Sequence, residues 1–224
     1  MNNLRQNIYK YFQQQSELFP DEIFFSERPN RQIRDMPGNK NSLNELHQNL
    51  FNCEKCALAE KCTQKVPGGG NSQAKLMLVG EAPGREEDKK GEPFVGKSGE
   101  LLDKILTAID LDREDVFISN IVKCRPPGNR NPHKKEIKDC IDFLKKEIEI
   151  VDPDMIVALG LTATKALLGT EGRLKDFRNQ TYEYQNRILI PTYHPSALLQ
   201  NPKYKKPTWE DFKKIKKLYF EEER

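Results

Sequence analysis

The sequence lacks any apolar run long enough to span a membrane, so no membrane anchor is expected. Its first residues, MNNLRQN, contain no apolar segment of the kind that directs secretion, which predicts a cytoplasmic protein. A strong charge imbalance is also missing, because 37 Lys and Arg face 34 Asp and Glu, for a formal net charge of +3. That mildly basic balance is compatible with a nucleic-acid ligand but does not require one.

Cysteine is scarce and odd in number, at five residues. Because cytosolic chains keep thiols reduced, a disulfide framework is a poor interpretation, and a four-ligand metal site with one spare thiol is the better one. Cys53 and Cys56 form a Cys-x-x-Cys pair, Cys124 and Cys140 are the other two candidate ligands, and Cys62 is the spare. Zinc and an iron–sulfur cluster both suit these spacings, and ordinary buried cysteines compete with either.

Residues 1–45 differ from the rest and are interpreted as an N-terminal extension, with the main domain over 46–224. A short amphipathic helix is expected near the start, with Leu4, Ile8, Tyr11 and Phe12 on one face. Polar, proline-containing sequence over 20–42 predicts a linker. Ser42 is then expected to cap the first helix of the main domain.

Four short apolar runs have the length and branched-residue content of buried strands; they are 75–79 (KLMLV), 116–119 (VFIS), 155–159 (MIVAL) and 187–190 (RILI). Apolar residues recur with helical spacing over 99–109, 134–150, 162–168 and 209–220. Strands that alternate with helices predict a single α/β domain, with a central four-stranded, mostly parallel sheet flanked by helices.

Polar or glycine-containing sequence follows every one of these runs. Gly80, Asn120 and Gly160 come after the first three, and Pro191–Ser196, which contains His194, follows the fourth. Because ligands bind at the carboxyl ends of parallel strands, one site assembled from distant residues is expected there. Each residue alone has an ordinary structural interpretation, as a turn, cap or core residue.

The segment from Gly80 to Gly99 is dense in Gly and Pro and contains Phe94 in a PFVG sequence. A surface loop is the simple interpretation. Glycine also lets a backbone approach a ligand closely, and an aromatic ring in such a frame offers a flat stacking surface.

The chain resembles the family 4 uracil-DNA glycosylases from about Phe51 to Phe220. The resemblance is carried by GEAPG-x-x-ED with G-x-PFVG-x-SG, then SNIVKCRPPGNRNP, and HPSALL followed by NP. It implies hydrolytic removal of uracil from single- or double-stranded DNA, and therefore a nucleoid-associated location. It also implies a monomer that holds a [4Fe–4S] cluster on the four candidate cysteines. A non-catalytic DNA-binding homologue and a zinc-stabilised hydrolase of another nucleoside are the alternatives.

The resemblance also implies roles for individual residues around a base flipped out of the stack. Phe94 would stack on the base, and the Asn120 amide would pair with its Watson–Crick edge. The backbone of Glu81 and Ala82 would contact the other edge. Glu87 would lie near C5 and exclude the methyl group of thymine.

His194 would donate to uracil O2, where negative charge develops as the glycosidic bond breaks. Strongly active relatives carry Asp where this chain has Ala82, so Glu81 is the candidate for positioning the attacking water. Leu198 would insert into the DNA stack as an apolar wedge. Three basic residues are candidate phosphate contacts: Arg125, Arg130 and Lys203.

Two features lie outside the motifs. His133 is expected to be a surface residue, although a related branch uses a histidine in this segment to trap DNA. Gln15–Phe19 (QSELF) resembles peptides that dock on bacterial sliding clamps, and a helix end whose apolar residues fold back is the competing interpretation.

Overall fold

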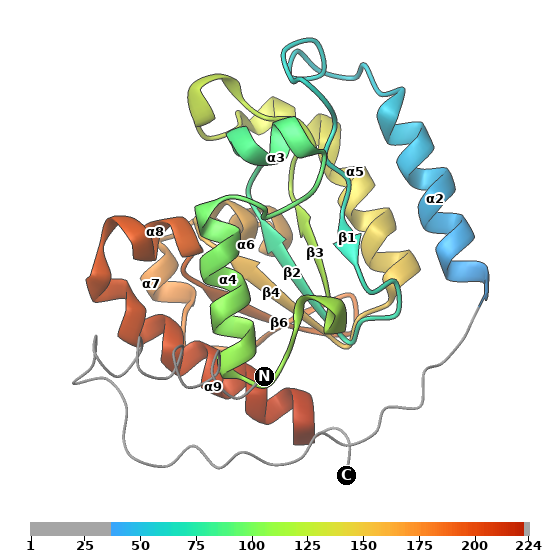
Figure 1. Cartoon of the computed structure of the whole chain (residues 1–224). Coiled ribbons are helices and arrows are strands. Elements are labelled where there is room, and N and C mark those ends of the chain that lie inside the picture. Colours follow the sequence, from blue (N-terminus) through green and yellow to red (C-terminus); the bar gives the residue numbers. More distant parts are fainter. Residues whose placement is uncertain (1–36, 222–224) are drawn as a thin grey trace.

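The computed structural model describes residues 37–221 (Figure 1). The helix expected near Leu4 and the clamp-like segment Gln15–Phe19 lie outside these residues. Within 37–221, no helix combines the length and the apolar character that crossing a membrane requires.

A six-stranded mixed sheet forms the centre, in the order β1-β3-β2-β4-β6-β5. The strands are β1 Gly69–Gly70, β2 Leu76–Gly80, β3 Val116–Asn120, β4 Met155–Leu159, β5 Tyr182–Tyr184 and β6 Arg187–Thr192. The four inner strands are parallel and coincide with the four apolar runs, which confirms the predicted fold class. The two edge strands are antiparallel, and at two and three residues they are too short to show a sequence pattern.

Eight α-helices lie in the described part of the chain: α2 Pro37–Phe51, α3 Arg85–Lys90, α4 Lys97–Ala108, α5 Lys134–Val151, α6 Leu161–Leu168, α7 Leu174–Phe177, α8 Pro195–Gln200 and α9 Lys205–Glu221. Three 3-10 turns accompany them: η1 Arg113–Asp115, η2 Pro127–Asn129 and η3 Pro202–Tyr204. The longer helices match the predicted ranges. The predicted linker is wrong at its end, because α2 begins at Pro37 rather than near Ser42. Proline suits the first turn of a helix, where its missing N–H loses no bond.

The helices cover both faces of the sheet (Figure 1). Alternate residues of each strand point to opposite faces. Met77 and Val79 of β2 therefore join a core with α2, α5 and α6, whereas Leu76 and Leu78 join a second core with α4 and α9. Strands that are buried on both sides explain the unbroken apolar runs in the sequence.

A buried ion pair ties the end of β3 to α5. Lys123 Nζ donates to Glu147 Oε2 at 2.5 Å and to Ser119 Oγ at 2.5 Å, and both ionic side chains are almost fully buried. Burial raises the pKa of Glu147, but Lys123 and hydrogen bonds to His47, Lys123 and Ser119 outweigh burial and bring that pKa to about 2. Ser119 directly precedes Asn120, so this network holds the strand end from which Asn120 projects.

Candidate active site

Gly80, Phe94 and Asn120 meet at the carboxyl end of β2 and β3. Gly80 lies beside Asn120 in the parallel register. A Cβ atom at position 80 would lie 2.4 Å from Asn120 Oδ1 and 2.7 Å from Phe94 Cζ, so only glycine fits between the two side chains. The structure therefore brings together three residues that are up to 40 positions apart in the sequence.

Asn120 has an unused hydrogen-bond acceptor inside the protein. The residue is 2% exposed, and its Oδ1 has no partner within the described part of the chain. A buried acceptor without a partner is destabilising by about 1–3 kcal/mol. An unpaired amide oxygen at a strand end is suited to receive a donor from a ligand.

Phe94 both neighbours the candidate site residues and belongs to the core. Its ring centroid lies 5.4 Å from that of His194, with the two planes tilted by 34°. The side chain is 4% exposed and packs with the apolar residues of α4, so the core interpretation of this phenylalanine also holds.

His194 caps helix α8 with its own ring. Its Nδ1 accepts a hydrogen bond from the Ser196 backbone N–H at 3.1 Å, and the Ser196 hydroxyl lies 2.8 Å away. A backbone N–H can only donate, so Nδ1 must be unprotonated and a neutral ring carries its hydrogen on Nε2. Burial lowers the pKa of His194 to about 4, although the nearby Glu87 charge opposes the shift. At neutral pH the ring is therefore an uncharged donor through Nε2.

The backbone around His194 is anchored from both sides. Position 160, at the end of β4, leaves no room for a large side chain, because a Cβ there would lie 3.2 Å from His194 Cβ. Thr192 Oγ1 donates to Asp211 Oδ2 at 2.5 Å, and Arg178 binds both oxygens of Asp211. The end of β6 is thereby held against α9.

Glu81 and Ala82 follow directly after Gly80. The Glu81 carbonyl accepts from the Val122 N–H at 3.1 Å, which extends the pairing of β2 with β3 beyond the strand ends. Burial raises the pKa of the Glu81 carboxyl, and a hydrogen bond with Thr162 at the start of α6 partly opposes this effect. Ala82 packs on the apolar core, and its methyl side chain cannot position a water molecule.

Glu87 is occupied within its own loop. Its Oε1 accepts from the Val95 and Gly96 N–H groups at 2.9 Å each, and its Oε2 accepts from the Gly84 N–H at 3.1 Å. Sequence reasoning did not predict this bracing role. Exclusion of a thymine methyl by Glu87 stays a prediction.

Leu198 is not at the protein surface, where the wedge role would require it. The side chain is 3% exposed and packs in the core beside α4, so insertion into DNA would require a change of conformation, and the wedge role stays a prediction. The next residue of α8, Leu199, points toward solvent instead and is 47% exposed. Helix geometry places neighbouring residues on different faces, which a sequence match alone does not resolve.

The cysteines gather between the segment after α2 and helix α5. Cys124 and Cys140 are buried, and Cys53, Cys56 and Cys62 pack against the same core. Burial raises the pKa of the Cys124 thiol, as do the neighbouring Cys62, Cys140 and Cys56. Cys62, expected to be a spare thiol, therefore lies against a candidate ligand.

Cys140 lies near two of the other candidate ligands. Its Sγ accepts a hydrogen bond from the Lys123 backbone N–H at 3.3 Å. Burial raises the pKa of this thiol to about 11, with Cys56 and Cys53 among the neighbours. Within residues 37–221, no three His, Cys, Asp or Glu side chains are arranged to hold a single metal ion. A cluster binds each thiolate at a different iron, so its ligands need not converge on one point.

The candidate phosphate contacts differ in availability. Arg130 binds both carboxylate oxygens of Glu136 at 2.9 and 2.7 Å, so its charge is already neutralised. Arg125 donates to Asn129 Oδ1 at 2.7 Å, and Lys203 is exposed. His133 is exposed at the start of α5, as expected.

The chain matches a known protein family and resembles several of its members. The model of the uracil DNA glycosylase superfamily matches residues 67–213. A type-4 uracil-DNA glycosylase of Sulfurisphaera tokodaii is 43% identical, over 79% of this chain and 84% of that protein. The type-4 enzyme of Archaeoglobus fulgidus is 41% identical, over 79% of this chain and 93% of that protein. The type-4 enzyme of Pyrobaculum aerophilum is 44% identical, over 71% of this chain and 86% of that protein.

Proposed function

The chain belongs to the uracil DNA glycosylase superfamily, and within it to the type-4 enzymes, and we infer that it hydrolyses the bond between uracil and deoxyribose in DNA. The product is an abasic site, at which base excision repair begins. The observation that carries this function is the Asn120 Oδ1, which has no partner among the described residues and lies beside Phe94, itself next to His194, at the end of the parallel strands.

Base recognition follows from the chemistry of the Asn120 amide. Its oxygen accepts from uracil N3–H and its NH₂ group donates to O4. Cytosine presents the opposite pattern, with an acceptor at N3 and a donor at N4, so it leaves both groups of the amide unpaired. The Phe94 ring stacks on the flipped base, because it stands beside this amide above Gly80.

His194 stabilises the leaving group. Cleavage leaves negative charge on the uracil ring, and the Nε2–H of a neutral imidazole donates to O2. Because Ser196 occupies Nδ1, the donor hydrogen is already on the correct nitrogen before the reaction begins. One preorganised donor of this kind typically accelerates the reaction by about 10²–10³-fold.

Glu81 is the proposed partner of the attacking water. Glu81 directly follows Gly80, which lies against Asn120 and Phe94, and Thr162 orients its carboxylate through a hydrogen bond. Replacement by Gln keeps the size and removes the base, so Glu81→Gln should slow excision without weakening DNA binding.

Single-turnover excision from uracil-containing oligonucleotides tests the proposed function. We expect abasic product from single- and double-stranded uracil DNA, and none from the same oligonucleotides with thymine. Binding of uracil DNA without abasic product, with Asn120 and His194 intact, would instead identify a DNA-binding homologue.

We further propose that Cys53, Cys56, Cys124 and Cys140 hold a [4Fe–4S] cluster. The fit is supported by the gathering of these thiols and by the N–H···S bond to Cys140, since such bonds are typical around cluster sulfurs. Bound there, the cluster would join the segment after α2 to α5. Replacement of each of the four by Ser should release iron from the purified protein, whereas Cys62→Ser should retain it; zinc in the metal analysis would contradict the proposal.

The segment Gln15–Phe19 is proposed to dock on a sliding clamp. Removal of residues 1–20 should abolish clamp binding and leave excision from short oligonucleotides unchanged. Equal clamp affinity of both forms would refute this role.

A further inference from the structure

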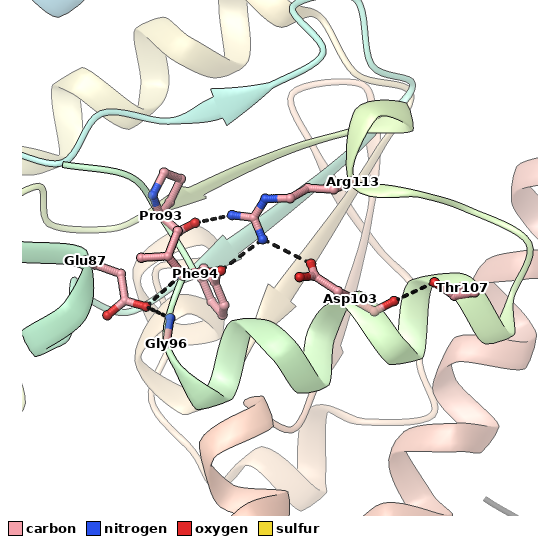
Figure 2. A network of polar contacts seen from close by, with 8 residues as sticks. Glu87, Pro93, Phe94, Gly96, Asp103, Thr107 and Arg113 are labelled. Carbon is pink, nitrogen blue, oxygen red and sulfur yellow. Dashed lines mark hydrogen bonds and ion pairs between the residues drawn. The ribbon is translucent and has the colours of Figure 1, made fainter. Parts of the chain in front are cut away.

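Two charged side chains hold the loop that carries Phe94, and both act on its backbone (Figure 2). Glu87 accepts from the N–H groups of Val95 and Gly96 at 2.9 Å each. Arg113 donates from Nη1 to the Phe94 carbonyl at 2.9 Å and from Nη2 to the Pro93 carbonyl. Each residue from Pro93 to Gly96 therefore has a backbone group that is bound by Glu87 or Arg113.

Arg113 reaches the loop from a separate part of the chain. It is the first residue of η1, directly before β3, and it is 20 positions beyond Pro93. Its Nη1 also lies 3.0 Å from Asp103 Oδ1 of α4, which orients the guanidinium group (Figure 2). A planar guanidinium presents several N–H donors in a fixed fork, so one side chain binds two carbonyls and a carboxylate together.

The backbone at Phe94 needs such support. Its φ angle is 53°, in the left-handed region that residues with a side chain rarely adopt. Non-glycine residues in that region persist only where their surroundings over-determine them. The Phe94 carbonyl also packs against Gly99 so closely that a Cβ at position 99 would lie 1.8 Å from the oxygen. This conformation turns the Phe94 ring toward Asn120 and His194.

We propose that Arg113 is a positioning residue for Phe94: by binding the carbonyls of Pro93 and Phe94 it keeps the ring in place to stack on the flipped base. This inference rests on the proposed function. Arg113 touches neither base nor DNA in this role, and it acts only through the loop. Without the Arg113 guanidinium, the Pro93 and Phe94 carbonyls lose these hydrogen bonds, and the Phe94 ring then leaves its stacking position.

A double-mutant cycle tests this coupling. Single-turnover excision is measured for wild type, Arg113→Gln, Phe94→Ala and the double variant, over a range of enzyme concentrations. Misplacement of a binding group by about 1 Å can slow a reaction about 10²-fold, so we expect Arg113→Gln to lose roughly 10- to 100-fold. In the Phe94→Ala background, Arg113→Gln should cause no further loss, because the ring that it positions is absent.

The matched control is Arg173→Gln. Arg173 also pairs with an aspartate, Asp176, but the pair is exposed and binds no loop carbonyl of the site. Its excision rate should equal that of wild type. Arg113→Lys keeps the charge without the fork, so it should recover only part of the loss, and it replaces Arg113→Gln in the cycle if that variant does not fold.

The outcomes separate this inference from the proposed function. Wild-type protein that releases no uracil refutes the function itself. Wild-type excision with an unaffected Arg113→Gln variant overturns the positioning role alone. An equal loss from Arg113→Gln with and without Phe94 also overturns it, because Arg113 would then act on general stability.

Discussion

Asn120→Asp tests base recognition most directly. Wild-type Asn120 offers uracil one acceptor and one donor, and both match. Cytosine mismatches both. A carboxylate offers acceptors only, so Asp would match N3–H of uracil but not O4, and would match N4–H₂ of cytosine but not N3. Each base then has one matched and one mismatched contact.

The structure sets the size of this effect, because residue 120 is 2% exposed and its Oδ1 has no other partner among residues 37–221. A buried polar group left unpaired costs about 1–3 kcal/mol, so uracil excision should fall by roughly 5- to 150-fold. In wild type, the two mismatches with cytosine favour excision of uracil over cytosine by about 2–6 kcal/mol. In Asn120→Asp each base has one mismatch, so this preference for uracil should nearly vanish.

The assay is single-turnover excision from paired oligonucleotides that differ only in uracil or cytosine at one position. Asn186→Asp is the matched control, because Asn186 is exposed in the turn between β5 and β6, at the opposite end of the sheet. The control should keep the wild-type ratio of uracil to cytosine excision. An unchanged ratio in Asn120→Asp would show that this amide does not read the base.

Three further outcomes follow. His194→Ala should lower the single-turnover rate by about 10²–10³-fold, with unchanged affinity for abasic DNA; a smaller loss would mean that another donor serves O2. Because burial lowers the pKa of His194 from 6.5 to about 4, the unfolded chain binds the proton more readily between these values. Stability should therefore fall as the pH drops through this window, and His194→Gln, compared by urea denaturation at pH 7 and pH 5, should lose less than wild type. Lys123→Met leaves the charge of Glu147 buried without this partner, so it should lower the free energy of unfolding, measured in urea, by about 3–5 kcal/mol. The double variant Lys123→Met with Glu147→Leu removes both charges and should therefore be less destabilised than Lys123→Met alone.

The fold class and the place of the site could be predicted from the sequence. Four runs of branched apolar residues identify strands that are covered on both faces, whatever their order in the sheet. Parallel strands place their carboxyl ends at one edge, so Gly80, Asn120 and His194 were expected to meet, and the structure brings them together. The motifs added the family, which the comparisons confirm.

Tertiary structure alone decided what each side chain does. Leu198 and Leu199 are equally apolar in the sequence, but the rotation of α8 buries the first and exposes the second. The tautomer of His194 depends on a hydrogen bond from Ser196, and the loop of Phe94 depends on a guanidinium 19 residues away. Sequence patterns report periodicity and burial, which are local and repeat along an element. Hydrogen-bond partners are single contacts between distant elements, and only the packing of those elements determines them.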